Sequence, residues 1–97
     1  MPVAHLFADL LAVGRPIPAD GAMGSALIAL GLPAGMPPEA WLLTPDGALA
    51  AGAVHAGHAA AGARIVLTAT FGASPVRLAD GTAAGRTVDV CRAAVVI

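Results

Sequence analysis

The run Ile65-Val66-Leu67 is the feature of this sequence that most constrains its fold. Two of its three residues are β-branched, and such residues favour an extended backbone. The run does not alternate with polar residues, as a strand with one solvated face would. Residues 63–70 are therefore predicted to form a strand that is buried on both faces, as in a parallel sheet.

A helix is predicted before this strand, at residues 45–61. Thr44 is a favourable N-cap, Pro45 suits the first helical position, and Asp46 places a negative charge in the first turn. Gly62 is a suitable C-terminal stop. The interior of the helix contains three glycines, Gly47, Gly52 and Gly57. Each costs about 1 kcal/mol relative to alanine, so the helix needs tertiary packing to persist.

Shorter signals complete the pattern around these two elements. Residues 5–13 have helical spacing that ends at Gly14, residues 86–97 show another helical pattern, and residues 75–79 suit one helical turn. Residues 16–19 form a short extended run in which two prolines oppose full strand pairing. The order helix, strand, helix, strand, helix predicts βα units with a parallel sheet.

The charge pattern argues against nucleic acid as a partner. The net charge is −1, with Asp+Glu 6 against Lys+Arg 5. All the basic residues are arginines, and they are scattered along the chain: Arg15, Arg64, Arg77, Arg86 and Arg92. We expect no nucleic-acid binding, because no stripe of positive charge could follow a phosphate backbone.

The chain is unusually apolar, with 58% hydrophobic and 11% charged residues. A stand-alone domain of 97 residues has much surface to cover with few polar side chains, so self-association is one expectation. The longest weakly polar stretch, residues 48–63, is short and contains two histidines, so no membrane span is expected. Asp9 interrupts the first apolar run and no basic region precedes it, so no signal peptide is expected.

Cys91 is the only cysteine. A single thiol excludes an internal disulfide and suits a reducing compartment, so a cytoplasmic location is expected. It cannot build a zinc site that needs several thiolates. His55 and His58 share a helix face through their spacing of three, but they have no third ligand near them in sequence. No metal site is therefore predicted.

Three short segments together form a recognisable pattern. Residues 20–25 read D-G-A-M-G-S, residues 61–63 read A-G-A, and residues 68–73 read T-A-T-F-G-A. In this order and spacing they resemble the D-G-A-M-G-T, A-G-A and T-N-T-F-G-A motifs of the homocysteine S-methyltransferase family. This family includes betaine-dependent enzymes and the homocysteine-binding module of cobalamin-dependent methionine synthase. The likeness covers most of residues 15–97.

The resemblance implies both a fold and an activity. The family fold is an α/β structure, the (β/α)8 TIM barrel, of which residues 1–97 would form the N-terminal part. Residues 1–14 would be a leading helix, and residues 15–97 would form about two βα units. The full-length family transfers a methyl group to the homocysteine thiol to give methionine, from a donor such as betaine, S-methylmethionine or methyl-cobalamin.

Two βα units cannot close a barrel, so this N-terminal fragment is expected to be inactive alone. The family binds zinc through cysteines late in its chain, and the metal keeps the substrate as a thiolate. Cys91 matches none of them, so the resemblance places no metal ligand and no catalytic residue here. The alternatives are an inactive remnant of such an enzyme and a self-associating, non-enzymatic α/β fragment.

The resemblance also assigns substrate-binding roles to the first motif. Asp20 would face the amino group of homocysteine, and the backbone amides around Gly21 and Met23 would meet its carboxylate. Glycine permits such a close approach because it has no Cβ. By residue type alone, the Asp20-Gly21 pair is also typical of a simple turn.

The second cluster of substrate-binding residues lies in the last motif. Thr68 and Thr70 would line the pocket, and Phe71 would form its apolar wall. The family's asparagine between the two threonines is Ala69 here, which removes an amide donor and acceptor. By residue type alone, the threonines also suit a strand end, and Phe71, like Trp41, suits an apolar core.

Overall fold

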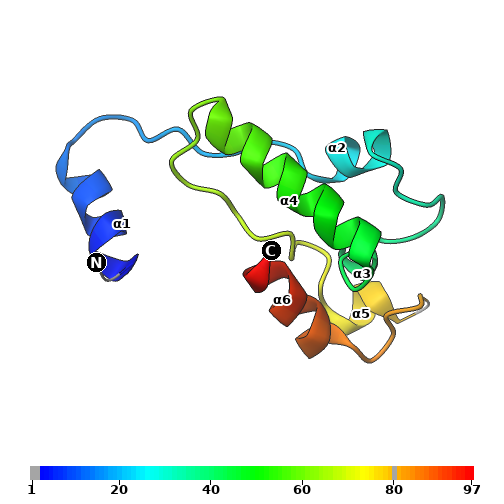
Figure 1. Cartoon of the computed structure of the whole chain (residues 1–97). Helices are drawn as coiled ribbons and strands as arrows, with labels where there is room; N and C mark the ends of the chain where they lie inside the picture. The colour runs from blue at the N-terminus through cyan, green and yellow to red at the C-terminus, as the bar shows by residue number, and fades with distance from the viewer. Residues whose placement is uncertain (1–2, 80) are drawn as a thin grey trace.

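The computed structural model describes residues 3–79 and 81–97 (Figure 1). Over these residues the backbone forms helices that are joined by turns and extended segments, with no strand. In chain order the helices are α1 (Val3–Ala12), α2 (Gly24–Ala29), α3 (Pro38–Trp41), α4 (Pro45–Ala60), α5 (Pro75–Leu78) and α6 (Thr87–Val96). Helix α1 lies in the predicted leading segment at residues 1–14, whose first two residues lie outside the described part.

The long helix α4 begins and ends where local signals predicted. The Gly47 N–H donates to Thr44 Oγ1 at 3.0 Å, and the Thr44 hydroxyl donates to the Trp41 carbonyl at 2.7 Å. Pro45 occupies the first turn. Gly62 has a φ of 111°, the left-handed conformation that commonly follows a helix end. The prediction of a helix at residues 45–61 is therefore confirmed.

The two shorter helical predictions near the C-terminus are also confirmed. Ser74 caps α5, because its hydroxyl accepts a hydrogen bond from the Arg77 N–H at 3.2 Å. Helix α6 occupies most of the predicted segment at residues 86–97. The Ser74 cap joins neighbours in sequence, which is why the sequence alone could locate the start of α5.

The predicted α/β fold class is wrong. Residues 16–19 and 63–70 do not form strands, and in the described part of the chain they meet at one isolated parallel bridge, between Ala19 and Ile65. A single bridge is not a sheet. The structure is therefore a helical assembly and not the N-terminal part of a TIM barrel.

Backbone chemistry explains why the bridge does not extend into a ladder. The N–H groups of Arg64 and Ile65 donate to the Pro18 carbonyl at 2.8 and 3.3 Å, and the Asp20 N–H donates to the Ile65 carbonyl at 2.9 Å. Pro16 and Pro18 have no N–H to donate, so this segment lacks donors just before the bridge. The predicted burial on both faces is wrong too, since Leu67 is 67% exposed and Val66 is 37% exposed.

The core forms between helices. In one cluster, Leu27 of α2 and Trp41 of α3 pack against three residues of α4. These are Ala50, Ala51 and Val54, and the cluster also contains Leu42, Ala69 and Ala94. A second cluster joins α3, α5 and α6 through Ala40, Leu78 and Val90. These two clusters hold α3 in the middle of the body, and α3 carries one side of the site described below.

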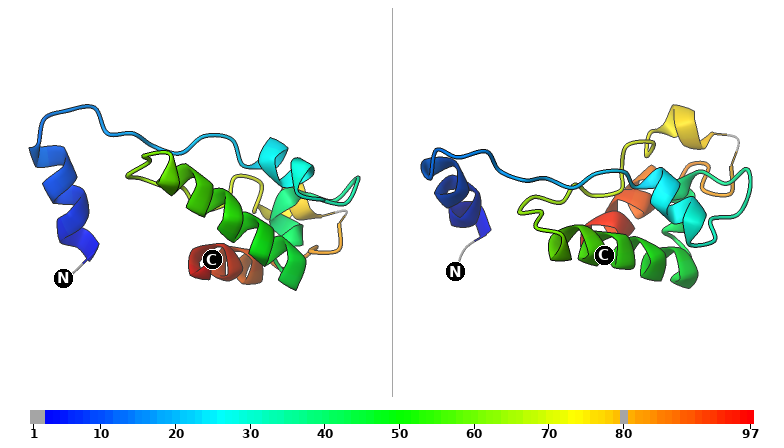
Figure 2. Two further views of the ribbon diagram at one scale, coloured as in Figure 1. Left: turned by 45° about the horizontal axis from the view of Figure 1, so that its top comes forward. Right: turned by 90° about the horizontal axis from the view of Figure 1, so that it is seen from above.

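Helix α1 stands apart from the other helices in every view, and an extended segment joins it to α2 (Figures 1 and 2). Its Phe7 and Leu11 side chains are 54% and 58% exposed. Between residues 3 and 97, Asp80 aside, every helix is too short or too polar to cross a bilayer.

Candidate functional site

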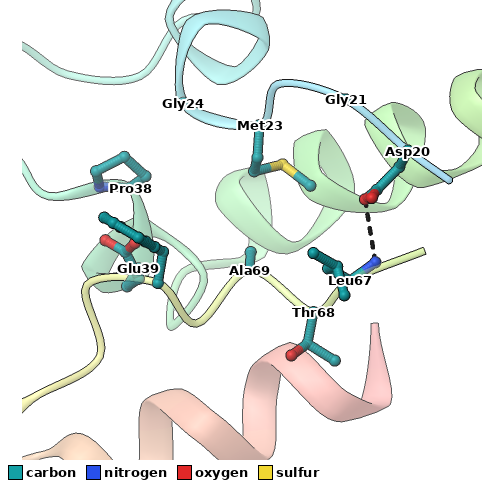
Figure 3. A pocket seen from close by; sticks show the side chains of 10 residues that line it. Asp20, Gly21, Met23, Gly24, Pro38, Glu39, Leu67, Thr68 and Ala69 are labelled. Atoms are coloured by element: carbon teal, nitrogen blue, oxygen red, sulfur yellow. Dashed lines mark hydrogen bonds between the residues drawn. The ribbon is translucent and has the colours of Figure 1, made fainter. Parts of the chain in front are cut away.

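A cleft of about 370 Å³ lies beside the bridge at Ala19 (Figure 3). Its walls come from three places in the sequence: the turn at residues 20–24, the start of α3, and the extended segment at residues 67–71. The first and last of these segments carry two of the motifs singled out in the sequence. The cleft is thus assembled by tertiary contacts between distant parts of the chain.

Five of the six predicted site residues line this cleft: Asp20, Gly21, Met23, Thr68 and Phe71. The sixth, Thr70, is outside the lining, but its hydroxyl lies 3.1 Å from the hydroxyl of Thr68. Phe71 is 96% exposed, so it stands at the open rim and does not form a closed apolar wall. The alternative interpretation of Phe71 as a core residue is wrong, whereas Trp41 is a core residue, with 6% exposure.

Asp20 connects the two motif segments. Its Oδ2 accepts a hydrogen bond from the Leu67 N–H at 3.1 Å, across 47 residues of sequence (Figure 3). Its own N–H donates to the Ile65 carbonyl at 2.9 Å. A carboxylate has about four acceptor positions, so one bond to the backbone leaves capacity for a ligand. The Asp20 carboxylate is therefore held in place at the cleft and can still accept a donor.

His58 holds the turn after Asp20 against α4. Its Nε2 lies 3.2 Å from the carbonyl oxygen of Ala22, within hydrogen-bond distance. A Cβ on Gly21 would lie 3.5 Å from His58 Cε1, so the turn packs closely on the imidazole. This contact gives His58 a structural role, which the sequence did not indicate.

Glu39 is the charged one among the lining residues that the sequence did not indicate, which are Gly24, Pro38, Glu39, Leu67 and Ala69. It lies in the first turn of α3, lines the cleft, and is only 9% exposed. Its Oε1 accepts a hydrogen bond from the Gly72 N–H at 2.8 Å. The one sequence signal was an acidic residue within the otherwise apolar stretch at residues 36–43. Its partner is 33 residues away, so the sequence pattern could not reveal the contact.

The chemistry of the cleft favours a cationic group with an apolar neighbour. Its charged lining residues, Asp20 and Glu39, are both acidic, and Figure 3 shows them toward opposite ends of the cleft. Met23 and Leu67 supply apolar surface to the same lining. Opposite charge attracts an ammonium group, and the apolar side chains favour an alkyl or thioether-like segment beside it.

The residues of the described chain do not fit the thiolate zinc site that the resemblance implies. Cys91 lies on α6 and packs against the second core cluster, away from the cleft lining. Over residues 3–79 and 81–97, no group of three or more His, Cys, Asp or Glu side chains is placed to hold a metal. We therefore assign no metal ligand to the residues of this chain that the structure describes.

Comparison with models of protein families gives a match that covers most of the chain. Residues 18–97 match the family model described as homocysteine S-methyltransferase. The curated proteins and the solved structures gave no match. The matched range begins just before the bridge at Ala19 and includes every residue that lines the cleft.

Proposed function

The chain belongs to the homocysteine S-methyltransferase family, and we propose that its cleft binds homocysteine as the acceptor of a methyl group. The observation that carries the proposal is the meeting of two family-like motifs, at residues 20–25 and 68–73, on one cleft. The bond between Asp20 and Leu67 joins them. Segments this far apart in sequence share a cleft only because the fold brings them together.

The proposed pose follows the charges of the amino acid. Homocysteine carries an α-ammonium group, which would donate to the free acceptor positions of the Asp20 carboxylate. Its carboxylate would approach the backbone amides around Gly21 and Met23, where Gly21 offers no Cβ to obstruct it. The side chain would run along Met23 and Leu67 toward the rim at Phe71.

The role that we propose for the cleft residues of this chain is to bind the substrate. In the family reaction the homocysteine sulfur forms a bond to the methyl carbon while the bond between donor and methyl breaks. The thiol loses its proton, because the thiolate is the nucleophile. The ionisable side chains of the described lining are Asp20, which the ammonium group engages in this pose, and Glu39, which accepts from the Gly72 N–H, so the thiol proton leaves to solvent. The residues of this chain therefore bind and orient the substrate in our proposal.

Calorimetric titration of the chain with L-homocysteine under reducing conditions tests the proposal. We expect saturable binding, and we expect Asp20→Asn to weaken it by about tenfold or more, because the amide keeps an acceptor for Leu67 but loses the charge that attracts the ammonium. Asp9→Asn is the matched control, since Asp9 is exposed on the separate helix α1. An absence of binding to the unaltered chain, or equal losses in the two variants, would contradict the proposal.

Self-association is the second candidate function, and exposed apolar side chains favour it. Leu67, Phe71 and Val76 are 67%, 96% and 85% exposed along one continuous stretch of the chain. Soluble monomers rarely leave large contiguous apolar patches in water. A second copy of the chain that covered these side chains would remove this surface from solvent.

A further inference from the structure

We propose that Glu39 is a positioning residue for the homocysteine cleft, because it fixes the loop of residues 70–73 and thereby places Phe71 at the rim. This inference rests on the proposed function, since it concerns how the same cleft is shaped. Among the side chains that the structure describes, Glu39 is the charged one that the fold buries, with 9% exposure. Burying a carboxylate is costly unless it is hydrogen-bonded, so its partner is informative.

The partner of Glu39 is the loop that follows the second motif segment. The Gly72 N–H donates to Glu39 Oε1 at 2.8 Å in a buried bond. Hydrogen bonds to a charged acceptor are shorter and stronger than neutral ones. The bond connects α3 directly to the residue that follows Phe71.

The loop is built to approach this carboxylate closely. A Cβ on Gly72 would lie 2.9 Å from Glu39 Oε2 and 3.0 Å from both Cδ and Oε1, so the carboxylate at the end of the Glu39 side chain would have to shift to make room for it. Glycine at position 72 therefore lets the backbone approach the Glu39 carboxylate in its present position.

Hydrogen bonds within the loop transmit this anchor to the cleft lining. The Ala73 N–H donates to the Thr70 carbonyl at 3.1 Å, and the Thr70 N–H donates to the Thr68 carbonyl at 2.8 Å. The chain from Thr68 to Ala73 is thus held as one turn-rich unit. Holding Gly72 to α3 therefore holds Thr68 and Phe71 in the lining of the cleft that Asp20 also lines.

Three variants test this role. Glu39→Ala removes the acceptor, Gly72→Ala adds a methyl group that displaces the carboxylate, and Glu39→Gln keeps an acceptor of the same size without the charge. Thr44→Ala is the control, because it removes the cap of α4 and lowers stability at a place outside the cleft lining. For each full-length chain, calorimetry would measure the Kd for L-homocysteine, and NMR would measure hydrogen exchange at the Gly72 amide.

We expect Glu39→Ala and Gly72→Ala to accelerate exchange at the amide of residue 72 and to weaken homocysteine binding about tenfold, the effect of losing one charge-assisted hydrogen bond. Glu39→Gln should stay within about twofold of the unaltered chain, since its amide oxygen still accepts from Gly72. Thr44→Ala should lower the melting temperature and leave the Kd unchanged.

Several outcomes would overturn the inference. If Glu39→Ala binds homocysteine as the unaltered chain does, the loop anchor has no part in binding. If Glu39→Gln is as damaging as Glu39→Ala, the charge acts directly on the ligand. If Thr44→Ala weakens binding equally, the effect is one of general stability. Should Glu39→Ala fail to fold, as judged by near-UV circular dichroism of Trp41, Gly72→Ala takes its place in these comparisons. Gly72→Ala that binds homocysteine as the unaltered chain does would then overturn the inference, as would Glu39→Gln that binds as weakly as Gly72→Ala.

The proposed function fails in a different way. If the unaltered chain does not bind homocysteine, the proposed function is overturned and the positioning role falls with it. If the unaltered chain binds and the Glu39→Ala and Gly72→Ala variants bind equally well, only the positioning role is overturned.

Discussion

Replacing Gly47 by alanine sets a local preference against a tertiary contact. In the interior of a helix, alanine is favoured over glycine by about 1 kcal/mol. In this structure a Cβ on Gly47 would collide with the carbonyl group of Trp41 and lie 2.8 Å from its Cγ. The Trp41 side chain is 6% exposed and packs in the first core cluster, so it cannot move aside freely. The tertiary contact therefore opposes the gain in helix propensity.

The contact should outweigh the propensity. Forcing an additional methyl group into a packed interior costs about 1–3 kcal/mol, and this site is tighter than most because the obstacle is backbone. Moving α3 away from α4 would also disturb the 2.7 Å hydrogen bond from the Thr44 hydroxyl to the Trp41 carbonyl. Taking the upper part of this range, about 2–3 kcal/mol, and subtracting the propensity gain of about 1 kcal/mol, we expect Gly47→Ala to lower the free energy of unfolding by about 1–2 kcal/mol.

Gly57→Ala is the matched control on the same helix. No atom lies within 4 Å of the position that its Cβ would take, so it should raise the free energy of unfolding by up to about 1 kcal/mol. Urea denaturation followed by Trp41 fluorescence and far-UV circular dichroism would compare the two variants. Opposite shifts of the midpoint are expected. A Gly47→Ala chain that is more stable than the unaltered one, with an unchanged Trp41 signal, would refute the packing argument.

Three further predictions concern the core, metal binding and solution behaviour. Ala69→Asn should lower thermal stability by about 1–3 kcal/mol, because Ala69 is 7% exposed in the first core cluster and the amide would lose water there; an unchanged melting temperature would argue against this. Zinc titration should give no stoichiometric, sub-micromolar complex, since Cys91 is the only thiol, and a tight complex in calorimetry would contradict this. Sedimentation velocity should show species larger than a monomer, because apolar side chains such as Phe71 are exposed. A thermal melt followed by near-UV circular dichroism should be broad. A monodisperse monomer with a sharp melt would count against self-association.

Helix ends could be predicted because the groups that determine them are neighbours in sequence. Thr44 accepts from the N–H three residues later, and Ser74 does the same for α5. The prediction of a strand at residues 63–70 was wrong for a related reason. A strand requires partners from elsewhere in the chain, and the segment with Pro16 and Pro18 supplies a single bridge.

The candidate site likewise contains residues that the sequence predicted and features that depend on tertiary contacts. The motif resemblance singled out Asp20, Thr68 and Phe71 from sequence alone, and the fold brings all three to one cleft. The exposure of Phe71 and the role of Glu39 could not be anticipated. Both depend on how α3 packs against a loop 33 residues further along the chain.

The sequence by itself determined the family, the capped helix α4 and five of the residues that line the cleft. These rest on motif order and on interactions that span three or four residues. The tertiary structure alone decided that the apolar run around Ile65 forms one bridge instead of a sheet, that Gly47 is required against Trp41, and that Glu39 is buried beside Gly72. The physical reason is that each of these outcomes is a packing or hydrogen-bond contact whose partner is set by the fold and not by the local pattern.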